Sequence, residues 1–440
     1  MSNLYIIAVF FAAIAVLILM IAKFKIHAVT SLFFVTILLG LLIGTPLNEI
    51  PGLINTGFGN TCKSVGLIIL LGSLLGEVMS ATGAAVKITK TFVKFFGEKH
   101  VLTAVGISCY LLGIPIFPDT ISLLIIPICT NLAAQTGISM VAFAAVVGIG
   151  VTSSSLVPPT PGPVAAAAIL GVPLGVAIPW GILVSIPGLV ITVFYASKLK
   201  KQIPLNEAFL QGEQIPEDRL PSFLKSIGPV LIPVLLIVIH TVCDAVIPGT
   251  AVSNIMSFIG EPLSALTIGC MLAVFTQVRD WWKKDDVRSG WIDKAILGCA
   301  GPVFITALGG SLAAFIKNAG VAEMLADMIV QAHIPGVFVP MIIACLIRTI
   351  TGSNTLGVTT SAALSLPMLG VLGLSPLAAF LSMCSGAVFV SHANSSGFWL
   401  VSSMCKMDMK DSFLSISGAS ALSGIFCSVT TLILYFAGII

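Results

Sequence analysis

Residues 71–83 read LGSLLGEVMSATG, and residues 308–320 read LGGSLAAFIKNAG. Each copy of this pattern lies in a long, almost uncharged apolar stretch and ends in a glycine at the same offset. Two copies of one pattern in an apolar chain are typical of a membrane protein that is built from two related halves. The repeat therefore predicts the fold, because such halves usually enclose a site near the middle of the bilayer.

The composition indicates that lipid is the solvent of this chain. Hydrophobic residues make up 57% and charged residues 9% of the 440 residues, and the mean hydropathy is +1.10. Soluble domains carry about 25% charged residues. Apolar runs of about 20 residues, which cross roughly 30 Å of hydrocarbon as helices, recur throughout. We count about 12 to 14 such segments and predict an all-α polytopic membrane protein. The expected partner is the lipid bilayer, and no nucleic acid is expected, because the basic residues lie in loops beside the membrane spans.

The basic loops predict the topology. Lys and Arg gather in five loops, at residues 23–25, 87–99, 198–225, 279–294 and 406–410. Loops of this kind stay in the cytoplasm, so we expect the N-terminus to lie outside the cell. The first copy of the repeat then begins outside and the second begins inside, which is the arrangement of an inverted repeat.

The domain organisation follows from the same pattern. We expect residues 1–200 to form the first membrane repeat and residues 226–440 to form the second, inverted one. Residues 201–225 contain the long polar segment of the chain and are predicted to be a cytoplasmic linker.

Four stretches at membrane depth are too rich in Pro, Gly and hydroxyl residues to be plain helices, namely residues 113–120, 152–163, 348–355 and 391–397. Proline lacks an N–H group and breaks the helical ladder, and lipid cannot satisfy the freed backbone groups. We therefore expect broken helices or re-entrant hairpins around a central cavity. The repeat offset sets the first break opposite the third and the second opposite the fourth. Half-helix N-termini in such a cavity suit an anion.

Asp119 and Arg348 each lie within a break. A charge at the bilayer centre costs about 2.5 to 3.5 kcal/mol on insertion scales, so it is rarely without a role. Arg348 can hold a carboxylate with two parallel hydrogen bonds, and Asp119 can carry a coupling proton. His392, in the fourth break, is a second candidate for the proton carrier, because histidine is the residue type that most often changes charge near neutral pH.

The same segments resemble the gluconate permease family of the wider ion transporter superfamily. The similar parts run through most of the chain, at residues 76–83, 113–127, 158–163, 348–355 and 391–399. The resemblance implies an inverted-repeat secondary transporter of the bacterial inner membrane. Its expected function is proton-coupled import of gluconate or a similar small hydroxylated organic acid by alternating access.

The breaks and the resemblance together give the candidate site residues. Those for ion coupling are Asp119 and His392. Those for substrate binding are Arg348, Ser353, Asn354, Thr355, Ser154, Ser155, Thr160, Asn394 and Ser395.

The chain departs from the family pattern in the presumed site. Gluconate permeases commonly read Pro-Pro-His-Pro-Gly-Pro where this chain has Thr160 in place of the histidine. They often read His-Val-Asn-Asp-Ser-Gly where this chain has Ala393 and Ser395. A small organic acid remains the expected substrate class, with a gluconate-like sugar acid, a shorter hydroxy acid or D-serine as alternatives.

Other functions are less compatible with the sequence. A sodium-coupled carboxylate transporter and a sodium/proton exchanger of the same superfamily stay open, although Arg348 would repel a cation in the site. We expect no enzyme, because no metal-ligand spacing, phosphate-binding loop or paired nucleophile and base is present. No cofactor is expected, the coupling ion is H⁺ or else Na⁺, and the superfamily resemblance is compatible with a homodimer.

Overall fold

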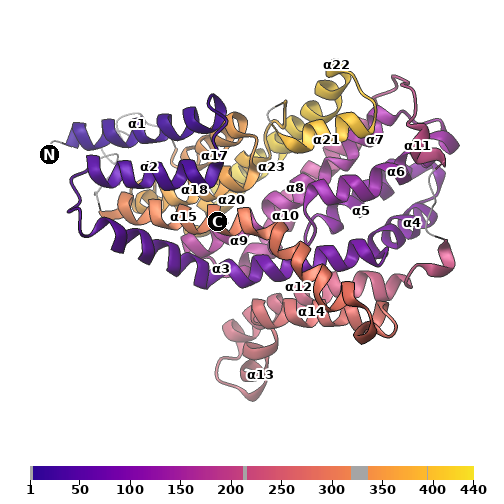
Figure 1. Ribbon diagram of the computed structural model, residues 1–440, viewed down its shortest axis with the longest axis horizontal. Helices are drawn as coiled ribbons and strands as arrows, with labels where there is room; N and C mark the ends of the chain where they lie inside the picture. The colour runs from indigo at the N-terminus through magenta and orange to yellow at the C-terminus, as the bar shows by residue number, and fades with distance from the viewer. Residues whose placement is uncertain (1–2, 212–215, 319–334, 394) are drawn as a thin grey trace.

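The computed structural model describes residues 3–211, 216–318, 335–393 and 395–440 (Figure 1). Within these ranges every regular element is helical, which confirms the predicted all-α class. The helices before the linker are α1 (Asn3–Ala22), α2 (Ala28–Leu42), α3 (Ile50–Ala81), α4 (Ala84–Phe96), α5 (Val101–Leu112), α6 (Pro118–Thr136), α7 (Met140–Val147), α8 (Ile149–Leu156), α9 (Pro161–Leu170) and α10 (Leu174–Ala196).

The linker carries the short helix α11 (Glu207–Gln211) and a 3-10 turn, η2 (Glu217–Arg219). The helices after it are α12 (Phe223–Val246), α13 (Ala251–Ile259), α14 (Pro262–Gln277), α15 (Trp291–Asn318), α17 (Phe338–Thr351), α18 (Asn354–Ser365), α19 (Leu369–Leu372), α20 (Pro376–Val388), α21 (Ser396–Met404), α22 (Met409–Ser412) and α23 (Gly418–Phe436). A π-helical segment, η6 (Phe413–Ser417), joins α22 to α23.

Seven helical segments in the described ranges are long and apolar enough to cross a membrane. An eighth span results if α13 and α14, which meet at 64°, count as one. Four further apolar helices, α2, α5, α17 and α20, are shorter. Several of the predicted hydrophobic segments are thus short helices that end at a break rather than full spans.

Residues 71–81 of the first copy lie on α3 and residues 308–318 of the second lie on α15, and these two helices run side by side (Figure 1). The end of the second copy, residues 319 and 320, lies outside the described residues. The Ser311 hydroxyl of α15 donates to the carbonyl of Ile54 near the start of α3, at 2.9 Å. At the other end, the Ser73 hydroxyl of α3 donates to the carbonyl of Ala295, at 3.1 Å. Residue numbers rise along one helix as they fall along the other, so the copies are antiparallel.

A second pair of corresponding helices, α10 and α23, also packs together. Gly188 of α10 lies against Ser423 of α23, and the Tyr195 hydroxyl donates to the carbonyl of Leu414 in η6, at 2.6 Å. These contacts again run in opposite directions along the two helices. Antiparallel packing of both pairs is the arrangement that an inverted repeat requires.

The four predicted breaks separate pairs of short helices. Residues 113–117 lie between α5 and α6, and residues 157–160 lie between α8 and α9. Gly352 and Ser353 lie between α17 and α18, and the fourth break follows α20 and ends at Ser396. Proline begins α6 and α9 at the first helical position, where its missing N–H costs nothing.

Candidate functional site

A cavity of about 600 Å³ lies where three of the four breaks meet. Its wall is formed by the first turn of α6, the junction of α17 with α18, and the residues that lead into α21. The cavity brings together six of the predicted site residues, which are Asp119, Arg348, Ser353, Asn354, Thr355 and Ser395.

Arg348 supplies the positive charge of this cavity. It occupies the last turn of α17 and is only 3% exposed. Its Nε atom is buried without a hydrogen-bond partner among the described residues, where no ion pair to its guanidinium is found either. An uncompensated buried charge is costly, so the site is well suited to a ligand that brings a negative charge.

The junction beside Arg348 forms a half-helix N-terminus. Gly352 ends α17 in the left-handed conformation, with a φ of +73°, which glycine adopts without strain. Ser353 then caps α18, because its hydroxyl accepts a hydrogen bond from the backbone N–H of Leu356, at 3.3 Å. The first backbone N–H groups of α18 lie at the positive end of the helix dipole, which favours an anion.

Asn354 connects this junction to the second break. Its Nδ2 donates to the hydroxyl of Ser155 in α8, at 2.5 Å. Its Oδ1 is buried and has no partner in the described part of the chain. This oxygen can therefore accept a hydrogen bond from a hydroxyl group of a ligand.

Asp119 also lines the cavity, in the first turn of α6 directly after Pro118. Its carboxylate is exposed to the cavity and accepts a hydrogen bond from the Ser396 hydroxyl of α21, at 3.3 Å. Asp119 and Arg348 thus line one cavity, yet they form no ion pair with each other. The cavity thus contains a buried guanidinium and a separate carboxylate.

The hydroxyl groups of the second break are turned toward its own backbone. Thr160 donates to the carbonyl of Ser154 at 2.6 Å, and Ser154 donates to the carbonyl of Val151 at 3.0 Å. The Thr160 bond satisfies the carbonyl of Ser154, which has no helical donor because Pro158 lies four residues further on. Neither Thr160 nor Ser154 lines the cavity. Ser155 reaches the cavity wall only through Asn354.

The remaining predicted residues lie in the fourth break. His392 is half-buried, and its carbonyl accepts from the backbone N–H of Ser395, at 2.9 Å; its side chain is not part of the cavity wall. Asn394 lies outside the residues that the structure describes. In the described ranges, no group of three or more His, Cys, Asp or Glu side chains is placed to hold a metal ion.

The breaks that touch are not the ones that correspond by repeat offset. Asp119 of the first break contacts Ser396 of the fourth, and Ser155 of the second contacts Asn354 of the third. The offset relates equivalent positions in the two halves. The observed hydrogen bonds instead join the first break to the fourth and the second to the third.

The cavity is also lined by polar side chains that were not predicted as site residues, namely His27, Ser122, Thr351, Ser391, Ser396 and Ser420. His27 follows α1, and its Nδ1 accepts a hydrogen bond from the backbone N–H of Val29, at 3.3 Å. In the sequence it follows Lys23 and Lys25 and is indistinguishable from an ordinary basic loop. No local signal indicates that this loop reaches a cavity formed by residues far along the chain.

Comparisons with known proteins identify relatives of this chain and a solved structure with a similar fold. The chain is 31% identical over 407 residues to a gluconate permease of Pseudomonas aeruginosa, covering 90% of each protein. It is 28% identical over 392 residues to the high-affinity gluconate transporter of Escherichia coli, covering 88% of this chain and 89% of the relative. The fold is similar to that of the Alcanivorax borkumensis YdaH transporter, with a TM-score of 0.64, 14% identity and 90% of both chains covered.

The family model of the GntP family permeases matches residues 4–437. With the candidate spans, this match identifies a multi-pass transporter of the bacterial inner membrane, and not an enzyme. The chain belongs to the GntP permease family.

Proposed function

We propose that this protein imports a small hydroxylated organic acid together with a proton, by alternating access of one central site. The observation that carries the proposal is the buried Arg348, whose Nε lacks a partner and which lines the same 600 Å³ cavity as Asp119. Relatives named as gluconate permeases support the substrate class.

The substrate carboxylate binds to Arg348 and to the N-terminus of α18. A guanidinium and a carboxylate pair through two parallel hydrogen bonds, which also fix the orientation of the acid. The hydroxyl groups of the substrate donate to Asn354 Oδ1 and exchange hydrogen bonds with Ser353, Thr355 and Ser395. A cavity of this volume has room for a short hydroxy acid and for a six-carbon sugar acid. Thr160 and Ser395 differ from the residues that gluconate permeases commonly have at these positions. Experiment must therefore decide between a short hydroxy acid and a six-carbon sugar acid.

Asp119 carries the coupling proton. It lines the cavity from α6 and accepts a hydrogen bond from Ser396. His392 is the weaker candidate, because its side chain is not part of the cavity wall. Loading of Asp119 with a proton offsets a charge in the site before the halves rearrange, which links uptake to the proton gradient.

The two repeats, residues 1–200 and 226–440, rock against each other around the cavity. The contacts between the halves, from Asp119 to Ser396 and from Ser155 to Asn354, lie directly beside the site. In this scheme the N-terminus is outside and the linker 201–225 is in the cytoplasm, as the basic loops indicate.

The test is uptake of labelled gluconate into proteoliposomes under an inward proton gradient, without sodium. Unlabelled hydroxy acids and D-serine serve as competitors. Accumulation that collapses with a protonophore is expected, and the strongest competitor identifies the substrate.

Two outcomes would overturn the proposal. If uptake requires sodium, then sodium, and not the proton, is the coupling ion. No uptake and no competition by any acid, in protein that elutes as a single folded species, would argue against an organic-acid substrate. Sodium-driven proton movement in the same vesicles would then identify an exchanger.

A further inference from the structure

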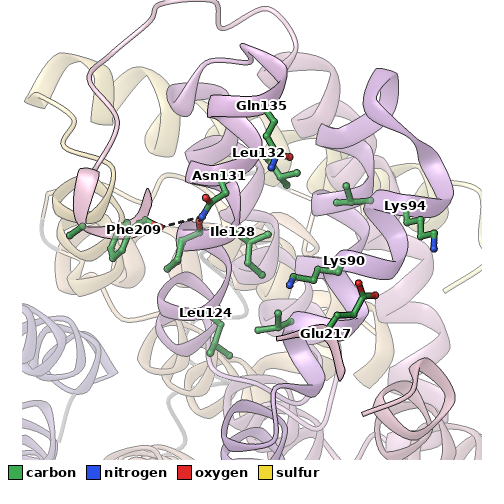
Figure 2. A pocket seen from close by; sticks show the side chains of 13 residues that line it. Lys90, Lys94, Leu124, Ile128, Asn131, Leu132, Gln135, Phe209 and Glu217 are labelled. Atoms are coloured by element: carbon green, nitrogen blue, oxygen red, sulfur yellow. Dashed lines mark hydrogen bonds between the residues drawn. The ribbon is translucent and has the colours of Figure 1, made fainter. Parts of the chain in front are cut away.

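A second cavity, of about 540 Å³, lies between α4 and α6, at the end of the molecule where α11 and η2 pack (Figures 1 and 2). It shares no lining residue with the cavity of Asp119 and Arg348. Its position beside the polar linker, away from the breaks, separates it from the proposed transport site.

The wall of this cavity is largely apolar. Eight of its lining side chains are apolar, namely Val86, Val93, Leu124, Pro127, Ile128, Leu132, Ala208 and Phe209. Leu124, Ile128 and Leu132 recur at every fourth position of α6 and form one continuous strip along it. A strip of this length is suited to an extended hydrocarbon chain.

The linker closes one side of the cavity. The Nδ2 of Asn131 donates to the carbonyl of Phe209 in α11, at 3.2 Å, and to the carbonyl of Pro127, at 3.0 Å (Figure 2). Asn131 thereby holds α11 against α6. The amide of Gln135, one turn further along α6, also lines the cavity and is available to a polar headgroup.

The rim of the cavity carries an excess of positive charge. Lys90 and Lys94 line it from α4, and Glu217 is the carboxylate that faces them. Glu217 is already paired with Lys87, whose Nζ lies 3.3 Å from its Oε1. Neither Lys90 nor Lys94 has an ion pair among the described residues. Three lysines on one helix thus share one carboxylate, and the rim favours an anion.

The surroundings indicate a membrane surface. Phe95, adjacent to Lys94, is 80% exposed, and Leu224, in the first turn of α12 at the end of the linker, is 79% exposed. Bulky apolar side chains beside lysines are typical of a segment that lies at the boundary between headgroups and acyl chains. Lysines at such a boundary attract anionic lipids.

We propose that this cavity binds an anionic phospholipid from the leaflet that the linker faces. Its phosphate pairs with Lys90 and Lys94, and one acyl chain lies along the strip of Leu124, Ile128 and Leu132. A free phosphate or a soluble organic anion would use the same lysines but leave the apolar wall unfilled. The apolar strip is therefore what favours a lipid over a soluble anion.

The test measures lipid binding and does not depend on transport. Full-length protein in phosphatidylcholine nanodiscs is titrated with fluorescent phosphatidylglycerol, and unlabelled phosphatidylglycerol or inorganic phosphate is added as competitor. The variant K90Q/K94Q removes the two rim charges. The variant K198Q/K200Q removes two charges from a neighbouring loop and serves as the matched control.

We expect the affinity of K90Q/K94Q for phosphatidylglycerol to fall at least about tenfold, since each lysine near a membrane surface contributes substantially to anionic lipid binding. The control variant should bind as the wild type does. A third variant, Ile128→Trp, fills the apolar strip and leaves the lysines intact. It should weaken lipid binding as well.

Equal binding by the wild type and K90Q/K94Q would overturn the proposal. Competition by inorganic phosphate at concentrations that also displace the lipid, with no effect of Ile128→Trp, would identify a soluble-anion site instead. Loss of binding in K198Q/K200Q to the same extent would mean that only general surface charge is measured.

Discussion

The Ser396 hydroxyl lies 3.3 Å from Oδ2 of Asp119 and donates a hydrogen bond to it. This contact joins α21 of the second half to α6 of the first, at the wall of the central cavity. Any rocking of the halves about the cavity changes the surroundings of this carboxylate. Its position is therefore suited to a group whose protonation is coupled to the conformational cycle.

Asp119→Asn should uncouple uptake from the proton gradient. The amide keeps the size and an acceptor oxygen for Ser396, but it does not take up a proton. We expect proteoliposomes with this variant to bring labelled substrate to equilibrium without concentrating it, while exchange of internal for external substrate continues. Asp218→Asn, in the linker turn η2, is the matched control and should accumulate substrate normally. A D119N protein that still concentrates substrate would exclude Asp119 as the carrier.

Arg348→Ala should abolish substrate binding. Truncation of one member of a buried, charge-assisted pair costs about 2 to 5 kcal/mol, which is roughly a 30-fold or greater loss of affinity. Arg348→Lys should recover part of it, because a lysine supplies charge without the two parallel hydrogen bonds. Binding is measured by titration calorimetry on protein checked by gel filtration, with the exposed Arg279→Ala as control. Unchanged affinity in R348A would remove this residue from the site.

Much of the fold follows from local sequence. Prolines and glycines gather within residues 113–118 and 157–161, where one helix ends and the next begins, so the positions of these breaks are predictable. Isolated prolines, such as Pro127 of α6, lie inside helices and are not a sufficient signal. The two copies of the repeat pattern also predict which helices correspond. These features depend only on the backbone chemistry of neighbouring residues.

The contacts that complete the site are not predictable in this way. Asn354 and Ser155 meet across 199 positions of sequence, and His27 reaches the cavity from a loop with no distinctive pattern. The Thr160 hydroxyl donates to the carbonyl of Ser154. The sequence does not show whether this hydroxyl faces the cavity or its own backbone. The role of Thr160 and Ser154 as ligands stays a prediction.

The ion pair of Lys87 and Glu217 should tether the linker in a pH-dependent way. The hydrogen bond from Lys87, together with the charges of Lys94 and Lys90, lowers the pKa of Glu217 below its usual value. A lowered pKa means that the tether is complete above the unfolded pKa of about 4.3 and is lost as the pH falls through the folded value.

We therefore expect Glu217→Gln to speed hydrogen exchange or proteolysis of residues 216–220 at pH 7. As the pH falls through the lowered pKa of Glu217, the wild type should lose its protection and come to behave like the variant. The adjacent Asp218→Asn, which removes a carboxylate outside the ion pairs of the described residues, should have little effect. Equal protection of the wild type and E217Q at pH 7 would show that the pair does not hold the linker.

The packing of the two repeat helices can be tested with two glycines of one helix. A Cβ atom on Gly57 of α3 would lie 2.6 Å from the Cα of Ser311 and 2.8 Å from the carbonyl oxygen of Gly310, both backbone atoms of α15. Backbone atoms cannot rotate away, so α3 and α15 would have to separate. At Gly59, two positions further along α3, a Cβ atom meets nothing within 4 Å.

Gly57→Ala should therefore destabilise the protein by about 1 to 3 kcal/mol, as overpacked cores do. Gly59→Ala should be neutral or stabilise it by up to about 1 kcal/mol, because alanine is the better helix former. The two variants differ by one methyl group from the same parent, so their apparent melting temperatures in one detergent are directly comparable. A lower melting temperature for G57A alone would support close antiparallel contact of the repeats. Equal shifts in the two variants would contradict it. The added methyl group would then have the same effect at position 57 as at position 59, where no neighbouring helix is close.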